Sequence, residues 1–258
     1  MFKRGQITLF VIIAIILIGA VATIVILRTG AIKAPVSAEE AEKIVASQIA
    51  PVKDLVTGCI QEPYSDSLKK IGMQGGYCTV SLKNSQLGNY SVPYLVEKSG
   101  NDYINNLLLL NGGNATIAKE IDRCIDMEKI MSCIDFGIFK DVTVNPTGEL
   151  TWETEILPGK IIITVNYPLT ISRGDAKATV DEMRLEVKTG LVNAYTAATA
   201  ITNSEVSSHD FDIGDYSVKN PNKVMISRQG APEAIYYYIT TIPAESEEAY
   251  QFNFAVDR

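Results

Sequence analysis

The stretch from Ile7 to Leu27 constrains this chain more than any other feature, because it contains no charged residue. At about 1.5 Å per residue, a helix over this stretch spans about 31 Å, which matches the hydrocarbon core of a bilayer. A helix also satisfies its own backbone hydrogen bonds, as lipid requires. A buried helix of a soluble protein rarely lacks a polar face over this length. The sequence therefore predicts a single N-terminal helix that spans a membrane or lines a filament core.

The bounds of this stretch also set the expected organisation of the chain. A removable secretory signal is the weaker interpretation, because its apolar region spans about 7–15 residues and Arg28-Thr29-Gly30 lacks a small-residue cleavage pattern. We expect a short basic leader over 1–6, a transmembrane or filament-core helix over 7–27, a juncture over 28–36, a helical front part with disulfides over 37–140, and a mainly β part of the same ectodomain over 141–258.

The charge of the chain limits its partners. The net charge is −7, and the exposed part is more acidic still once Lys3, Arg4 and Arg28 are set aside. An acidic ectodomain lacks the basic surface that nucleic acid requires. We therefore expect no nucleic-acid partner, and we expect contacts with membrane lipid and self-association through the N-terminal helix.

Four cysteines, Cys59, Cys78, Cys124 and Cys133, all follow the apolar stretch. An even number in an exported domain favours two disulfides and an extracellular location. Of the three connectivities we favour Cys59–Cys124 with Cys78–Cys133, because both bridges then close long loops within the front part. Free thiols in a reducing compartment are the alternative. No metal site is expected, because there is no Cys-x-x-Cys pair and the only histidine, His209, is distant in sequence.

Two sequons make Asn89 and Asn114 glycosylation candidates on such a domain. A third Asn-x-Thr sequence starts at Asn145, but Pro146 excludes it.

An amphipathic helix is expected after the juncture. Ser37 and Glu40 form a capping box, and apolar residues follow at helical spacing. Pro51 predicts a kink. We expect the helix to continue to about residue 71 and to stop at Gly72 and the Gly75-Gly76 pair. A phosphate-binding role for these glycines is the minor alternative, since no strand precedes them.

The rest of the chain predicts an α+β fold with a mainly antiparallel sheet. Short strands are expected over 77–82 and 90–96, and a helix over 116–131. A hairpin over 150–156 and 160–167 turns at Pro158-Gly159. The strand over 176–188 changes its inward register at Asp181-Glu182, which indicates a bulge. A helix over 191–201 and strands over 223–228, 234–242 and 250–256 complete the chain, the last with alternating apolar and polar residues typical of a half-buried strand.

The sequence contains few residues in catalytic patterns. It lacks a nucleophile elbow, a phosphate loop and a zinc-protease motif. We therefore expect no catalytic residues and no cofactor; an enzyme would need His209 or a carboxylate pair. Asp210, Asp212 and Asp215 are expected in a solvated loop, with a calcium site as the alternative. Tyr236 and Tyr238 should share one strand face, as packing or as a contact surface.

The N-terminus supports a family resemblance. Lys3-Arg4-Gly5-Gln6-Ile7-Thr8-Leu9 resembles the class III signal of archaeal type IV pilins, in which a basic residue and a glycine precede a glutamine. The resemblance implies cleavage between Gly5 and Gln6 by a prepilin-type peptidase, and bundling of the apolar helices as a filament core. The chain differs at Phe10, where these pilins usually carry an acidic residue.

Arg4-Gly5-Gln6-Ile7-Thr8-Leu9-Phe10 and Gly75-Gly76-Tyr77 also resemble elements of uncharacterised membrane-anchored surface proteins of small archaea. That resemblance implies no known activity. Two hypotheses follow. The first is a non-enzymatic cell-surface structural protein, a pilin-like filament subunit or surface component. The second is a single-pass membrane-anchored extracytoplasmic protein that binds or adheres to a partner.

Overall fold

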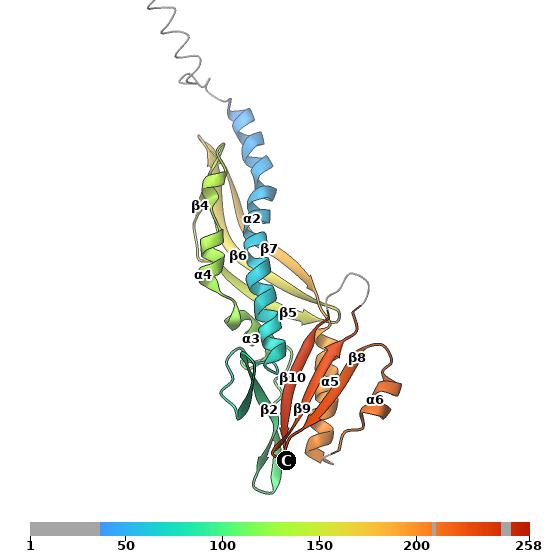
Figure 1. Ribbon diagram of the computed structural model, residues 1–258. Coiled ribbons are helices and arrows are strands. Elements are labelled where there is room, and N and C mark those ends of the chain that lie inside the picture. The colour runs from blue at the N-terminus through green and yellow to red at the C-terminus, as the bar shows by residue number, and fades with distance from the viewer. Residues whose placement is uncertain (1–36, 208–209, 244–248) are drawn as a thin grey trace, which may run out of the picture.

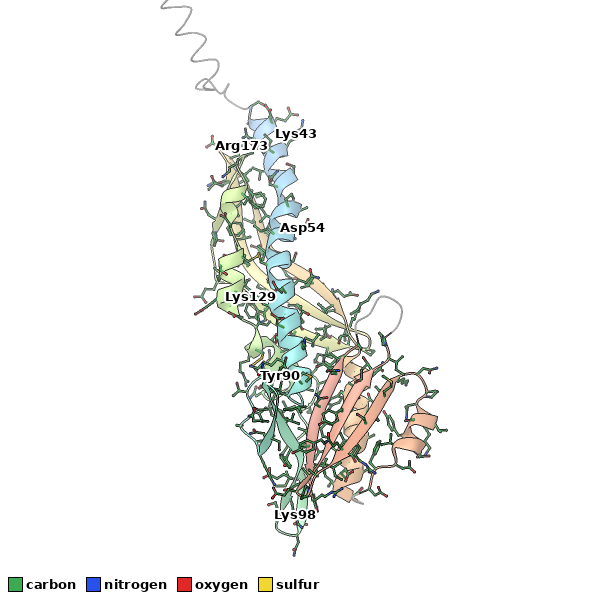
Figure 2. The ribbon with its side chains drawn as sticks, in the orientation of Figure 1. Lys43, Asp54, Tyr90, Lys98, Lys129 and Arg173 are labelled. Carbon is green, nitrogen blue, oxygen red and sulfur yellow. A yellow bond between two sulfur atoms is a disulfide. The ribbon has the colours of Figure 1, made fainter. Side chains whose placement is uncertain are left out.

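The computed structural model describes residues 37–207, 210–243 and 249–258. Within these ranges the chain has an α+β fold, in which one long helix runs beside two sheets (Figure 1). Lys43, near the start of the helix, and Arg173 lie at one end of the elongated molecule, and Lys98 lies at the other (Figure 2).

Helix α2, Ala38–Met73, begins where the capping box predicts. The Ser37 hydroxyl accepts a hydrogen bond from the backbone N–H of Glu40 at 3.2 Å. The helix continues through Pro51 and Pro63 as one element, so it does not break where a kink was expected. Val52, next to the first proline, is fully buried against the core, and this packing holds the helix together where its backbone hydrogen bonding is weakened.

The first sheet packs against α2 and contains β4 (Thr143–Pro146), β5 (Thr151–Leu157), β6 (Lys160–Arg173) and β7 (Ala176–Lys188). Strands β4 and β5 pair antiparallel with opposite ends of β6, and β7 pairs with β6 along its length. The predicted hairpin of β5 and β6 is confirmed, with Leu157 opposite Lys160 across the turn.

The predicted change of register in β7 is confirmed, because Val180 and Met183 are both buried. Val180 pairs with Leu169 and Glu182 with Asn166, so Asp181 faces two residues of β6. The extra residue therefore lies on β6, at the Tyr167-Pro168 step, rather than on β7. A proline there is expected, because it has no N–H to donate to the ladder.

The second sheet has the strand order β1-β2-β10-β9-β8, with β3 also paired to β2. All pairings are antiparallel except β2 with β10. Helix α5 packs against it, and α6 contacts β8. The bounds are β1 Asn84–Leu87, β2 Tyr90–Ser99, β3 Asp102–Asn105, β8 Val224–Gly230, β9 Ala234–Thr241, β10 Gln251–Asp257, α5 Leu191–Ser207 and α6 Ile213–Lys219.

Strand β10 differs from the sequence expectation. It was expected to be half-buried, but Phe252, Asn253, Phe254 and Ala255 are all buried. The strand lies in the middle of the sheet, between β9 and β2. Helix α5 contacts it, and Ala255 joins a separate small apolar cluster with Val92 of β2. A central strand covered on both faces needs no polar face.

Two short helices, α3 (Ile117–Cys124) and α4 (Met127–Cys133), replace the single helix expected over 116–131. The chain leaves the helical conformation at Ile125, and Asp126 caps α4 by accepting the N–H of Lys129 at 3.0 Å. The 3₁₀ helix η1, Phe136–Ile138, follows. The strand expected over 77–82 is absent, and this segment is an irregular link that carries Cys78.

Candidate functional site

The expected processing site, Gly5 and Gln6, and the apolar stretch over 7–27 lie outside the described residues. Within the ranges that the structure describes, no helix combines the length and the apolar character needed to cross a membrane. The described residues nevertheless contain the cysteines, the sequons, the acidic stretch and the tyrosines that the sequence singled out.

The four cysteines form two disulfides, as expected, but with a different connectivity. Cys59 pairs with Cys133, with Cα atoms 5.6 Å apart. Cys78 pairs with Cys124, with Cα atoms 5.3 Å apart. The favoured pairing of Cys59–Cys124 with Cys78–Cys133 is therefore wrong.

The direction of α3 and α4 along α2 explains the observed pairing. Ser67, in the last third of α2, donates a hydrogen bond to the carbonyl of Ile121 in α3 at 3.1 Å. Lys129 of α4 lies 3.0 Å from Glu62 and 3.1 Å from Asp66, earlier on α2. The chain thus runs back toward the start of α2 as it passes from α3 to α4. This course brings Cys133 to Cys59 and leaves Cys124 near the end of the helix.

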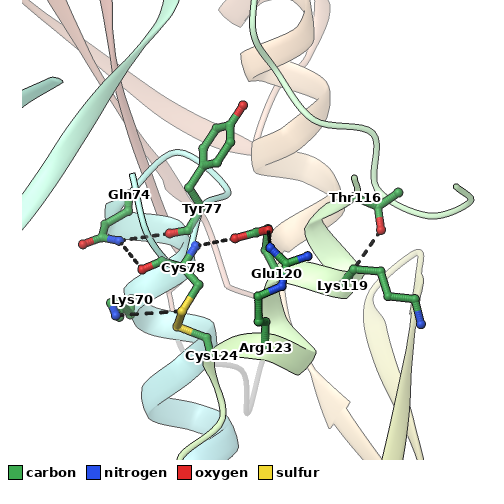
Figure 3. A network of polar contacts seen from close by, with 9 residues as sticks. All are labelled: Lys70, Gln74, Tyr77, Cys78, Thr116, Lys119, Glu120, Arg123 and Cys124. Carbon is green, nitrogen blue, oxygen red and sulfur yellow. Dashed lines mark hydrogen bonds and ion pairs between the residues drawn. A yellow bond between two sulfur atoms is a disulfide. The ribbon is translucent and has the colours of Figure 1, made fainter. Parts of the chain in front are cut away.

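A polar network surrounds the second disulfide (Figure 3). The Glu120 carboxylate accepts the backbone N–H of Cys78 at 2.9 Å and pairs with Arg123. The Gln74 side-chain amide donates to the carbonyls of Tyr77 and Cys78 at 3.0 and 2.9 Å. Burial, together with the negative charge of Glu120, raises the pKa of Tyr77 to about 12. The network joins the end of α2 and the link that follows it to α3.

A cavity of about 570 Å³ lies where α2 meets the ends of β7 and β10. Its apolar wall includes Leu68, Leu185 and Val187, with the aromatic side chains of Tyr64 and Tyr250. The Tyr250 hydroxyl donates to the carbonyl of Leu68 at 3.3 Å. Burial raises the pKa of both phenols well above the usual range, so both remain neutral at physiological pH.

The polar wall of the same cavity comes mainly from one stripe of α2. Gln61, Ser65 and Lys69 line it, and residues four apart lie on one helix face. Lys188, at the end of β7, lines it from the sheet. The sequence did not predict this cavity. The four-residue spacing of Gln61, Ser65 and Lys69 on α2 is the pattern in the sequence that relates to it.

A shallower hollow of about 450 Å³ lies beside Trp152. The Trp152 indole is half-buried and donates to the carbonyl of Asp122 at 3.2 Å. The Asp122 carboxylate lies 3.8 Å from Lys119, and burial raises its pKa. Its Oδ1 atom is buried without a hydrogen-bond partner among the described residues, so a ligand in the hollow has no access to that oxygen.

The aspartates of the acidic stretch make contacts within α6 and at its start. Asp212 caps α6 by accepting the N–H of Asp215 at 2.9 Å, and Asp215 pairs with Lys219. No group of three or more His, Cys, Asp or Glu residues in the described ranges is placed to hold a metal ion.

The tyrosines of β9 make contacts inside the protein. Tyr237 is fully buried, and its hydroxyl donates to Glu205. Tyr236, on the other face of β9, donates to Ser85 at 2.8 Å, which favours packing over a contact surface.

The two sequons differ in how accessible they are. Asn89 is exposed in the turn between β1 and β2. Asn114 is exposed too, but Thr116 of its sequon is buried and caps α3 by accepting the N–H of Lys119. The folded chain therefore presents Asn89 as the more open candidate, and modification at either residue stays a prediction.

Comparison with known proteins does not assign the chain to a family. No protein-family model matches the chain, and neither a curated protein nor a solved structure matches it.

Proposed function

We propose that this chain is a non-enzymatic cell-surface protein of pilin-like build, whose apolar N-terminal segment inserts into a membrane or lines the core of a filament. The observation that carries the proposal is the position of α2. Only ten residues separate Leu27, where the uncharged stretch ends, from the start of this helix at Ala38, which lies at one extremity of the molecule (Figure 1). A helix that emerges at an extremity leaves the preceding segment room to enter lipid or a bundle.

The packing of α2 supports the same proposal. Val45, Val52, Val56 and Ile60 are buried along one side of the helix, and α2 contacts both β6 and β7 of the first sheet. The helix therefore packs against the first sheet of the same chain along most of its length. At about 1.5 Å per residue, its 36 residues extend about 54 Å, which places the second sheet far from the segment that enters the membrane or filament.

The disulfides support an extracytoplasmic location. Both bridges join α2, or the segment just after it, to α3 and α4. Such bridges persist mainly in oxidising compartments. They would also keep the two short helices on α2 when a filament or an anchored protein is placed under tension.

Expression of the full chain in a host that contains a prepilin-type peptidase tests the proposal. We expect intact-mass spectrometry to find a chain that begins at Gln6, and electron microscopy of sheared cells to show filaments or membrane-bound arrays. A Gly5→Val variant should keep residues 1–5 and remain dispersed in the membrane. A wild-type chain that is neither processed nor recovered from membranes or filaments would refute the proposal.

The second candidate is a single-pass anchored protein that binds a partner. The cavity at the junction of the two sheets favours it, since its size falls in the range of about 300–1,000 Å³ that is typical of ligand sites. In this case the native protein keeps residues 1–5 and is recovered from membranes as dispersed chains rather than assemblies.

A further inference from the structure

Among the described residues that line it, the cavity between α2, β7 and β10 has two lysines and one acid. Lys188 lies directly opposite Lys160 in the β6–β7 pair, and like charges opposite each other on neighbouring strands destabilise a sheet. Glu186 compensates only one of them, because its carboxylate lies 2.9 Å from the Lys160 ammonium. Lys188, which lines the cavity, has no ion pair among the described residues.

The second lysine of the cavity is Lys69 of α2. Asp66 lies three residues before Lys69 on α2, but it pairs with Lys129 of α4, as does Glu62. Lys69 has no ion pair of its own in the described part of the chain. Among the described residues, the cavity thus has two ammonium groups without an ion pair in a protein whose net charge is −7, and the one acid of that lining, Glu186, pairs with Lys160.

The remaining walls indicate the shape of the ligand. Leu185 and Val187 are partly exposed and provide an apolar surface, and the buried side chains of Leu68, Tyr64 and Tyr250 lie behind it. This aliphatic wall favours an apolar body such as a ring, and the lysines favour a negative group attached to it. The volume of about 570 Å³ admits a molecule of this size.

We propose that this cavity binds a small organic anion, a carboxylate carried on a flat apolar body such as an aromatic ring. Lys69 and Lys188 would contact the carboxylate, and the partly exposed Leu185 and Val187 would contact the ring. The inference rests on the second candidate function, a binding protein, and does not depend on whether the chain also assembles into filaments.

The test uses the full chain in nanodiscs of zwitterionic lipid, with 4-(trifluoromethyl)benzoate as probe and 4-(trifluoromethyl)benzamide as its neutral isostere. Fluorine NMR follows line broadening of each probe, with empty nanodiscs as the reference. We expect saturable binding of the benzoate, with one probe per chain. We expect binding of the benzamide to be at least about tenfold weaker, because about 1.4 kcal/mol of charge interaction corresponds to that factor.

Substitutions locate the binding. The double variant Lys69→Gln/Lys188→Gln should reduce benzoate affinity to the level of the benzamide. The matched control Lys43→Gln/Lys177→Gln removes the same charge from α2 and β7 outside the cavity and should bind like wild type. Ser65→Phe fills the cavity without changing its charge, and it should weaken both probes.

The outcomes separate this inference from the function on which it rests. Equal binding of the two probes, or an unchanged benzoate affinity in Lys69→Gln/Lys188→Gln, overturns the anion assignment and leaves a cavity that binds neutral ligands. Absence of saturable binding by either probe overturns the anion assignment and also removes the support that the cavity lends to a binding function.

Discussion

The Glu120 carboxylate accepts a hydrogen bond from the backbone N–H of Cys78 at 2.9 Å, and so connects α3 to the link that follows α2. Glu120 is 8% exposed, and it also pairs with Arg123. The Cys78 N–H is partly buried, and a hydrogen bond to a charged acceptor contributes about 1.5–3 kcal/mol. The carboxylate therefore stabilises a segment that has no regular secondary structure.

Glu120→Ala should lower the free energy of unfolding by about 2–3 kcal/mol, because a charged acceptor is lost and the Cys78 N–H is left unsatisfied. Glu120→Gln keeps an acceptor oxygen and should cost about half as much. Urea unfolding of the oxidised protein measures both. Glu155→Ala, at an exposed position of β5, is the control and should be near neutral. Equal stabilities for the Glu120 and Glu155 variants would contradict the role given to this contact.

The observed connectivity predicts the effect of removing either disulfide. The residues of the Cys78–Cys124 and Cys59–Cys133 bridges are 46 and 74 positions apart. In the chain-entropy model, loops of this length correspond to about 4 kcal/mol for each bridge. Removing either bridge should lower the free energy of unfolding by about that amount. Denaturant unfolding of the variants Cys78→Ser/Cys124→Ser and Cys59→Ser/Cys133→Ser measures the loss.

Peptide mapping without reduction checks the connectivity itself. It should recover peptides linked through Cys59–Cys133 and Cys78–Cys124. Recovery of Cys59 linked to Cys124 would show that the course of α3 and α4 along α2 is different from the one described above.

Two glycines of α2 should respond in opposite directions to the same substitution. A Cβ at Gly72 would lie 2.1 Å from the carbonyl oxygen of Gln251 and 2.8 Å from the Tyr250 ring, whereas a Cβ at Gly58 would meet nothing within 4 Å. Gly72→Ala should destabilise the protein by about 2 kcal/mol or more, because the β10 backbone must move. Gly58→Ala should stabilise it by about 0.5–1 kcal/mol through helix propensity. Thermal unfolding of the two variants side by side tests both signs.

Local patterns in the sequence predicted much of the fold, because they act over a few residues. The start of α2 follows from the Ser37 and Glu40 capping box. The alternation of apolar residues predicted β7 over 176–188, including its change of register near Asp181. Such signals require no knowledge of the neighbouring elements.

The features that the sequence could not predict all depend on segments that are distant along the chain. The disulfide connectivity follows from the return of α4 along α2, which no pattern around Cys124 or Cys133 encodes. The burial of both faces of β10 depends on its central place in the sheet and on contact with α5. The cavity forms only where α2, β7 and β10 meet, so Lys69 and Lys188 carried no signal individually.

The ion pair between Lys83 and Asp257 predicts a pH dependence of stability. Burial alone would raise the pKa of Asp257, but hydrogen bonds from the Lys83 ammonium at 2.9 Å and the Lys98 N–H at 3.3 Å outweigh burial and lower it. A carboxyl whose pKa is lowered by folding contributes stability above its unfolded pKa of about 3.9, and this contribution is lost as the pH falls through the folded pKa.

Asp257→Asn should therefore lower the free energy of unfolding by about 1 kcal/mol at pH 7, since Lys83 is partly exposed and solvent screens the pair. The difference from wild type should shrink as the pH falls below about 3.9 toward the lowered pKa of folded Asp257, because protonation of the wild-type carboxyl then removes the same charge. Urea unfolding of wild type and variant at pH 7, 5 and 3 measures this difference in the free energy of unfolding. Asp102→Asn, at an exposed position of β3 without an ion pair among the described residues, should show no such trend. A difference for Asp257→Asn that is unchanged at pH 3 would mean that the charge of Asp257 does not contribute, because only a charge-dependent interaction disappears on protonation.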